Sequence, residues 1–93
     1  MTKDTILQAA LDLASTPPGR YDRLTRSEIA KRANCATGSI NYYFTDMAGL
    51  RDAVVAAAIP ARAHRVVAAA IMDGHPAVAG LTASERQEAL AGL

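Results

Sequence analysis

The feature that most constrains the fold is the stretch of residues 24–50, LTRSEIAKRANCATGSINYYFTDMAGL. Thr25 and Glu28 have the spacing of a capping box, in which a hydroxyl and a carboxyl satisfy free N–H groups at the start of a helix. This spacing predicts a helix that runs to about Ala33. Asn34 tolerates the left-handed backbone of a tight turn, and a second short helix is expected to end near Phe44. Two short helices joined by a tight turn have the spacing of a helix-turn-helix.

A helix-turn-helix places its second helix in the major groove of DNA, so the polar residues of that helix are candidates for contact with DNA. Thr25 and Arg26 are expected to hold phosphates, while Thr37, Ser39 and Asn41 are expected to face base edges. The full set of candidate DNA-binding residues is Thr25, Arg26, Thr37, Gly38, Ser39, Asn41, Tyr42 and Tyr43.

Two kinds of candidate leave alternatives open. Gly38 allows close approach either to another backbone segment or to a phosphate. Tyr42 and Tyr43 can each contact the DNA backbone through the hydroxyl group, or can be buried in the core with that hydroxyl satisfied. Phe44 is expected to be buried beside Ile40.

The rest of the chain also predicts helices. Apolar residues recur at helical spacing over residues 4–15, and the prolines and glycine that follow leave residues 16–23 as an exposed loop. A helix is expected after the aromatic corner formed by Tyr42, Tyr43 and Phe44, and Pro60 should kink or break it. Thr82 and Glu85 form a second capping box, which opens a short last helix.

Strand patterns are almost absent, and half of the residues are apolar, so the expected fold class is all-α. We expect a helix-turn-helix three-helix bundle followed by a kinked fourth helix and a short C-terminal helix. Residues 1–51 should form the DNA-binding bundle, and residues 52–93 should form C-terminal helices that serve dimerisation.

Charge gives only modest support for binding to nucleic acid. The net charge is +1. Residues 1–51 carry seven Lys and Arg against five Asp and Glu, and residues 52–93 carry three against four. The first half is therefore the more favourable face for DNA.

Nothing in the sequence supports an enzyme, a metal site or a cofactor. Cys35 is the only cysteine, and His64 and His75 have no ligands at metal-binding spacing. No signal peptide opens the chain, and the longest apolar run, residues 53–59, is too short to cross a bilayer. We expect a cytoplasmic protein without a membrane partner.

Residues 5–59 resemble the N-terminal DNA-binding region of TetR-like transcriptional regulators. The first helix ILQAALDLAS, the segment TRSEIAKRA and the corner GSINYYFTDMAGL carry the resemblance. The positions that fill the expected slots of the family pattern are Thr25, Ile29, Ala30, Ala33, Gly38, Ile40, Tyr43, Phe44 and Leu50. The resemblance implies a DNA-binding transcriptional regulator that acts as a repressor.

Several positions depart from the family pattern. Ala36 replaces a capping serine, Thr37 stands where Lys or Arg is common, and Asn41 replaces a tyrosine. Asn34 replaces the glycine of the turn, and Met47 replaces a lysine that meets a phosphate in the family. Two cations are thus missing from the expected DNA face, and each phosphate contact contributes to affinity.

Family members also carry a second helical domain that binds a small molecule and dimerises. Only about 35 residues follow Ile59. The resemblance therefore implies a regulator without small-molecule sensing, of the short kind encoded by a phage or a plasmid.

We expect a homodimer, because residues 52–93 offer more apolar surface than the first three helices can cover. The stripe comprises Val54, Val55, Ala58, Val66, Val67, Ala70 and Ile71, with Leu81, Leu90 and Leu93 in and near the last helix. The alternative is that the last helix folds back and covers this stripe within one chain.

The second functional hypothesis is a protein-binding module, such as an antirepressor or inhibitor built on the same fold. The low net charge and the missing lysine favour it, whereas the intact turn serves either function.

Overall fold

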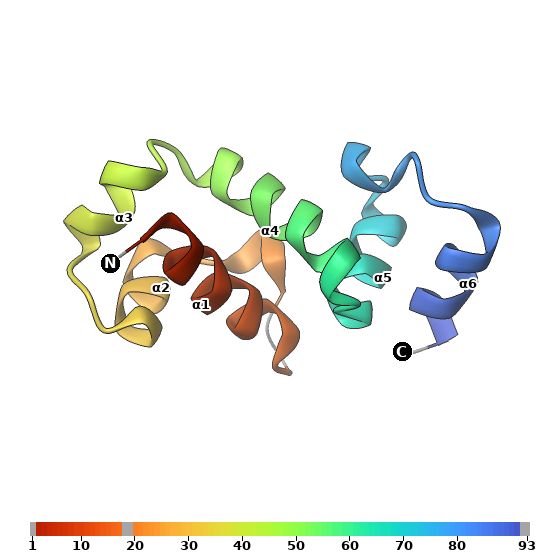
Figure 1. Cartoon of the computed structure of the whole chain (residues 1–93), viewed down its shortest axis with the longest axis horizontal. Helices are drawn as coiled ribbons and strands as arrows, with labels where there is room; N and C mark the ends of the chain where they lie inside the picture. Colours follow the sequence, from red (N-terminus) through yellow and green to blue (C-terminus); the bar gives the residue numbers. More distant parts are fainter. Residues whose placement is uncertain (1, 18–19, 92–93) are drawn as a thin grey trace.

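The computed structural model describes residues 2–17 and 20–91, and the described residues form helices and loops without a strand. In chain order the elements are α1 (Lys3–Ser15), the 3₁₀ turn η1 (Tyr21–Arg23), α2 (Arg26–Ala33), α3 (Thr37–Tyr43), α4 (Met47–Ala61), α5 (His64–Asp73), the 3₁₀ turn η2 (Pro76–Val78) and α6 (Ala83–Ala91). Figure 1 shows α1 to α3 at one end of an elongated molecule and α5 and α6 at the other, with α4 between them. The all-α prediction is confirmed.

Local capping sets where the helices begin. The Thr25 hydroxyl accepts a hydrogen bond from the Glu28 N–H at 3.2 Å at the start of α2. The second capping box is complete, since the Glu85 N–H donates to the Thr82 hydroxyl and the Thr82 N–H donates to the Glu85 carboxylate. Asp46 accepts from the Gly49 N–H at the start of α4. Both predicted capping boxes therefore mark real helix starts.

The helix that contains Pro60 ends just after it rather than merely bending. Helix α4 continues to Ala61, and Arg62 then takes the left-handed conformation with φ 55°. Helix α5 begins two residues later and packs against α4. Of the two outcomes that the sequence left open at Pro60, the structure has the break.

One apolar core runs the length of the molecule. The buried face of α4 consists of Leu50, Val54, Val55 and Ala58. It packs on α1 at one end and on α5 at the other. The expected boundary between residues 51 and 52 falls inside this helix, so α4 contributes to both parts of the chain.

The apolar stripe of the C-terminal half is covered within one chain. Val66, Val67 and Ala70 on α5 are at most 4% exposed, and α6 packs against that helix with Ala89 buried. Ile71 is half-buried, and Leu93 lies outside the described residues. The fold-back alternative therefore describes most of this stripe, while Leu90 on α6 is 39% exposed. Dimerisation through residues 52–93 stays a prediction.

One residue of the segment that was expected to be an exposed loop, Tyr21, belongs to the core, whereas Thr16, Pro17, Asp22 and Arg23 are exposed as expected. Tyr21 is only 6% exposed, and its hydroxyl donates to Asp73 at 2.8 Å. Arg20 also binds Asp73, at 2.7 Å, so the connection between α1 and α2 is tied to the last residue of α5. Pro18 and Gly19 lie outside the described residues. None of the described helices is long and apolar enough to cross a membrane.

The aromatic corner generates a test of stability. Phe44 is 8% exposed, and Phe44→Ala should lower the free energy of unfolding by about 3–5 kcal/mol because it leaves a cavity. Thr25→Ala should cost about 1 kcal/mol through loss of the cap. Tyr42→Ala is the matched control, since Tyr42 is 80% exposed and should be near neutral. Chemical unfolding of the three variants measures this, and a Phe44→Ala protein as stable as the parent would contradict the packing described here.

The buried side chain of Tyr21 predicts that the stability of the fold falls at alkaline pH. Burial, together with the hydrogen bond to Asp73, raises the pKa of Tyr21 from 10.0 to about 12. A folded pKa above the unfolded value means that this contribution is complete below pH 10 and is lost as the pH rises to 12. Tyr21→Phe should therefore be less stable than the parent near neutral pH, and the difference should shrink over this range. Tyr42→Phe, measured in parallel by thermal melting, is the control, because it removes the hydroxyl of a tyrosine that is 80% exposed.

Candidate DNA-binding surface

Helix α3 presents one continuous polar face to solvent. Ile40 points inward and is fully buried, whereas Thr37, Gly38, Asn41 and Tyr42 are exposed. Residues four apart lie on the same side of a helix, so Thr37 lies beside Asn41 and Gly38 beside Tyr42. Helix α3 lies at the end of the molecule away from α6 (Figure 1), so these four residues are accessible to a large partner.

The two tyrosines have different environments. Tyr42 is 80% exposed, so the alternative that placed it in the core is wrong. Tyr43 is half-buried and packs against the core cluster. The two rings meet edge to face, with centroids 4.9 Å apart. Tyr43 therefore supports the ring of Tyr42, whose hydroxyl remains accessible to a phosphate.

No contact among the described residues explains why position 38 should be a glycine. It lies in the first turn of α3, and a Cβ added there would meet no described atom within 4 Å. Its φ does not lie in the left-handed region. Close packing against another backbone segment, one of the two reasons that the sequence offered, is therefore wrong. Approach of a phosphate to Gly38 stays a prediction.

The start of α2 lies near the corner between α3 and α4. A terminal nitrogen of Arg26 lies 3.4 Å from the Thr45 carbonyl oxygen, which it contacts as a donor. The Nε of Arg26 is buried and has no hydrogen-bond partner among the described residues. The Thr25 hydroxyl also donates to the Glu28 carboxylate. Thr25 and Arg26 thus have partners within the protein. A phosphate that binds these two side chains would either bind alongside those partners or replace them.

A further cation reaches this corner from α1. Lys3 places its Nζ 5.1 Å from the centroid of the Phe44 ring. This contact could not be predicted from local sequence patterns, because forty residues of chain separate the two partners. Lys3 adds a positive charge beside the end of α3. Met47, by contrast, is half-buried and packs against the core, so the family's lysine is here replaced by an apolar contact.

The turn between α2 and α3 has the expected left-handed residue. Asn34 has φ 57° and ψ 51°, and the Cys35 N–H donates to the Ala30 carbonyl at 2.9 Å. Ala36 precedes α3 without a side-chain cap, as its residue type dictates. Within the described residues, no group of three or more His, Cys, Asp or Glu side chains could hold a metal ion.

Two helices joined by this turn, with a polar outer face on the second, define a DNA-binding helix-turn-helix. Residues 6–54, more than half of the chain, match the model of the family described as bacterial regulatory proteins, tetR family. The chain belongs to the TetR family of DNA-binding regulators. Comparisons with curated proteins and with solved structures found no match.

Gly38 provides a test that separates folding from binding. Gly38→Ala should raise the free energy of unfolding by about 0.5–1 kcal/mol, because alanine is the better helix residue and has open space. The same change should weaken DNA binding if the backbone approaches a phosphate there. Gly80→Ala is the control, since its added Cβ also meets no described atom within 4 Å. A Gly38→Ala protein with unchanged affinity would contradict this use of the glycine.

Proposed function

We propose that this protein is a sequence-specific transcriptional repressor that lays α3 in the major groove of its operator. The observation that carries the proposal is that α3 exposes a polar face while its opposite side is buried in the core. The groove admits one α-helix, and a recognition helix must expose side chains while its own position stays fixed. Ile40 and Phe44 provide that fixed base.

Each exposed residue of α3 has a role suited to its chemistry. Asn41 can bind adenine with two hydrogen bonds, and the Thr37 hydroxyl can donate or accept at a base edge. Ser39, which is half-buried, lies at the flank of this face. The Tyr42 hydroxyl and the ammonium of Lys3 can each meet a phosphate. Repression then follows from occupation of promoter DNA in the cytoplasm.

A single copy of this surface offers few positive charges. Arg51 donates to the Leu24 carbonyl, and Arg32, although exposed, lies 3.6 Å from Asp12, so both already have partners within the protein. Each phosphate contact contributes to affinity through release of counterions. We therefore propose that two copies bind together, so that two recognition helices act on half-sites one helical turn apart. Pairing through residues 52–93 stays a prediction.

The first experiment measures sequence preference. Asn41→Ala should relax the preference at one or two base positions and weaken specific binding by about 1–3 kcal/mol. Gln87→Ala removes an exposed amide from α6, at the other end of the molecule, and should have no effect. Selection from random duplex DNA, followed by titration at two salt concentrations, gives both quantities. Absence of salt-sensitive binding to any duplex would refute DNA binding and leave a protein-binding module.

The second experiment measures how many copies bind. We expect two copies on an operator with two-fold symmetry, with half-site centres about 34 Å apart or a multiple of that distance. Light scattering of the free chain and of its complex with the selected duplex gives the number. A single copy bound at saturating protein would exclude the paired arrangement and a palindromic operator.

A further inference from the structure

His75 lies at the start of the connection between α5 and α6, and both nitrogens of its ring have a hydrogen-bond partner. The Nδ1 atom accepts the N–H of Ala77 at 3.0 Å, and this bond caps the 3₁₀ turn η2. The Nε2 atom lies 2.8 Å from a carboxylate oxygen of Asp52 on α4. The side chain is only 12% exposed. The ring therefore joins η2 to α4 at a site that is largely shielded from water.

The two partners determine which ring nitrogen carries the hydrogen atom. A neutral imidazole has one N–H donor and one lone pair that can accept a hydrogen bond. Because a backbone N–H can only donate, the bond from Ala77 requires that Nδ1 carries no hydrogen atom. The hydrogen atom is therefore on Nε2, which donates it to Asp52. His75 has a neutral ring in this arrangement.

A second proton can add to this ring only at Nδ1. The new N–H would point at the N–H of Ala77, and two donors cannot form a hydrogen bond. The bond to Asp52 is retained, since Nε2 carries a hydrogen atom in both forms, and it becomes an ion pair. Protonation thus separates His75 from η2 and leaves it attached to α4.

Other titratable and charged groups near His75 have partners of their own. The ring of Tyr21, from η1, meets the ring of His75 edge to face, with centroids 5.8 Å apart. The hydroxyl of Tyr21 donates to Asp73, the last residue of α5, which also binds Arg20. Asp52 is therefore the charged group that a protonated His75 contacts directly within the described part of the chain.

The turn that His75 caps is one of the attachments of α6. Val78, the last residue of η2, is 3% exposed, and η2 packs on both α4 and α5. Its carbonyl oxygen accepts a hydrogen bond at 2.7 Å from Arg86, the charged residue that α6 brings to this turn. Release of the Ala77 N–H therefore weakens a turn through which α6 is attached to α4 and α5.

We propose that His75 is a proton-sensitive switch in the connection between α5 and α6. The neutral ring holds η2 and α4 together, whereas the protonated ring keeps Asp52 and releases the N–H of Ala77. Imidazole suits this role because it gains a proton between about pH 8 and pH 5. The released turn lets α6 open more often from its place over α5. DNA binding by α3 is not needed for this switch, because α3 lies at the other end of the molecule (Figure 1).

The test follows the isotopically labelled 93-residue chain by NMR as the pH is lowered from about 8 to 5. We expect the amide proton of Ala77 to shift upfield as its hydrogen bond is lost, with the same midpoint as the ring protons of His75. Protection of the α6 amides against hydrogen exchange, corrected for the intrinsic rate at each pH, should be about three- to tenfold lower at the acid end. This decrease corresponds to the loss of one hydrogen bond.

Two substitutions of His75 fix the turn in one state or the other. His75→Asn provides an amide oxygen that can accept the Ala77 N–H but cannot gain a proton. The Ala77 signal and the α6 protection should then be independent of pH. His75→Phe keeps an aromatic ring beside Tyr21 but offers no acceptor. Its Ala77 amide should have the upfield position already at about pH 8.

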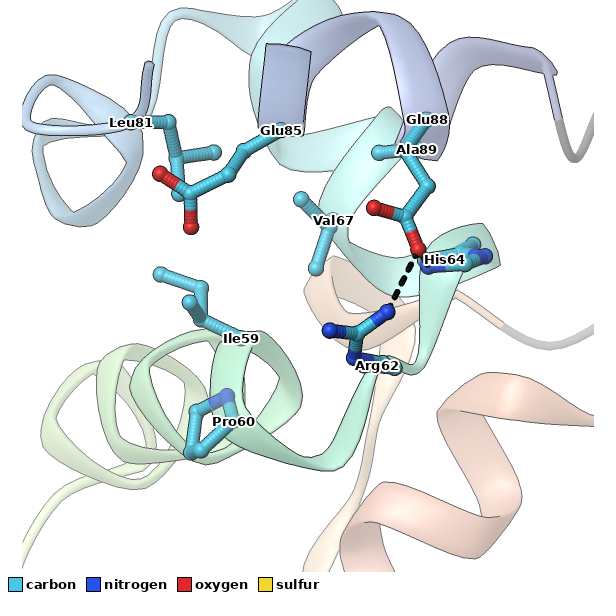
Figure 2. A pocket seen from close by; sticks show the side chains of 9 residues that line it. All are labelled: Ile59, Pro60, Arg62, His64, Val67, Leu81, Glu85, Glu88 and Ala89. Carbon is cyan, nitrogen blue, oxygen red and sulfur yellow. Dashed lines mark hydrogen bonds and ion pairs between the residues drawn. The ribbon is translucent and has the colours of Figure 1, made fainter.

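His64→Asn is the matched control, because it removes the other histidine of the chain. The Nε2 atom of His64 lies 3.3 Å from the Glu88 carboxylate, which also binds Arg62. Figure 2 shows these three side chains along one side of a hollow of about 290 Å³ between α4, α5 and α6. In this variant the Ala77 signal should respond to pH as it does in the parent chain.

Four results would overturn the proposal. In the parent chain they are a His75 ring that stays neutral to the acid end of the titration, an Ala77 amide that does not follow that ring, and α6 amides that are equally protected throughout. The fourth is a folded His75→Asn chain that keeps the parent's response. The first three need no variant, so a variant that fails to fold leaves the test intact. None of these results bears on whether α3 binds DNA, so the two proposals fail separately.

Discussion

Burial of one face of α4 is the constraint on which the rest of the structure depends. Leu50, Val54, Val55 and Ala58 are all fully buried, and they contact elements on both sides of the helix. The first part of α4 holds the base of the helix-turn-helix, and its later part carries α5 and, through α5, α6. A polar substitution on this face would therefore affect both ends of the molecule, because burial of an unsatisfied polar group is costly.

The parts of the fold that the sequence predicted are those set by near neighbours along the chain. A capping box joins residues three apart, and the left-handed turn depends on Asn34 itself. Thr25, Thr82 and Asn34 could therefore be interpreted correctly without knowledge of the tertiary structure. The polar face of α3 follows in the same way, because alternation around one helix turn separates the buried Ile40 from Asn41 and Tyr42.

The parts that the sequence did not predict depend on residues far apart in the chain. Tyr21 was placed in an exposed loop because its partner, Asp73, lies fifty-two residues further on. The same limit applies to Lys3 and Phe44, and to the covering of the α5 stripe by α6. Apolar periodicity shows that a face must be buried, but it does not show which element covers it. That is why the cover that α6 provides for most of the α5 stripe was not predicted, although Leu90 is still 39% exposed.

The bonds of Arg20 and Tyr21 to Asp73 have a consequence for dividing this chain into smaller pieces. Beside them, His75 meets Tyr21 edge to face and binds Asp52 at 2.8 Å, while its Nδ1 accepts the Ala77 N–H. The region that matches the family ends at residue 54, before Asp73, His75 and Ala77. A fragment trimmed to the matched region would lose the side chains that hold the segment between α1 and α2. A helix-turn-helix fragment that keeps all of these contacts must therefore extend at least through Ala77, beyond the limits that the motif alone would suggest.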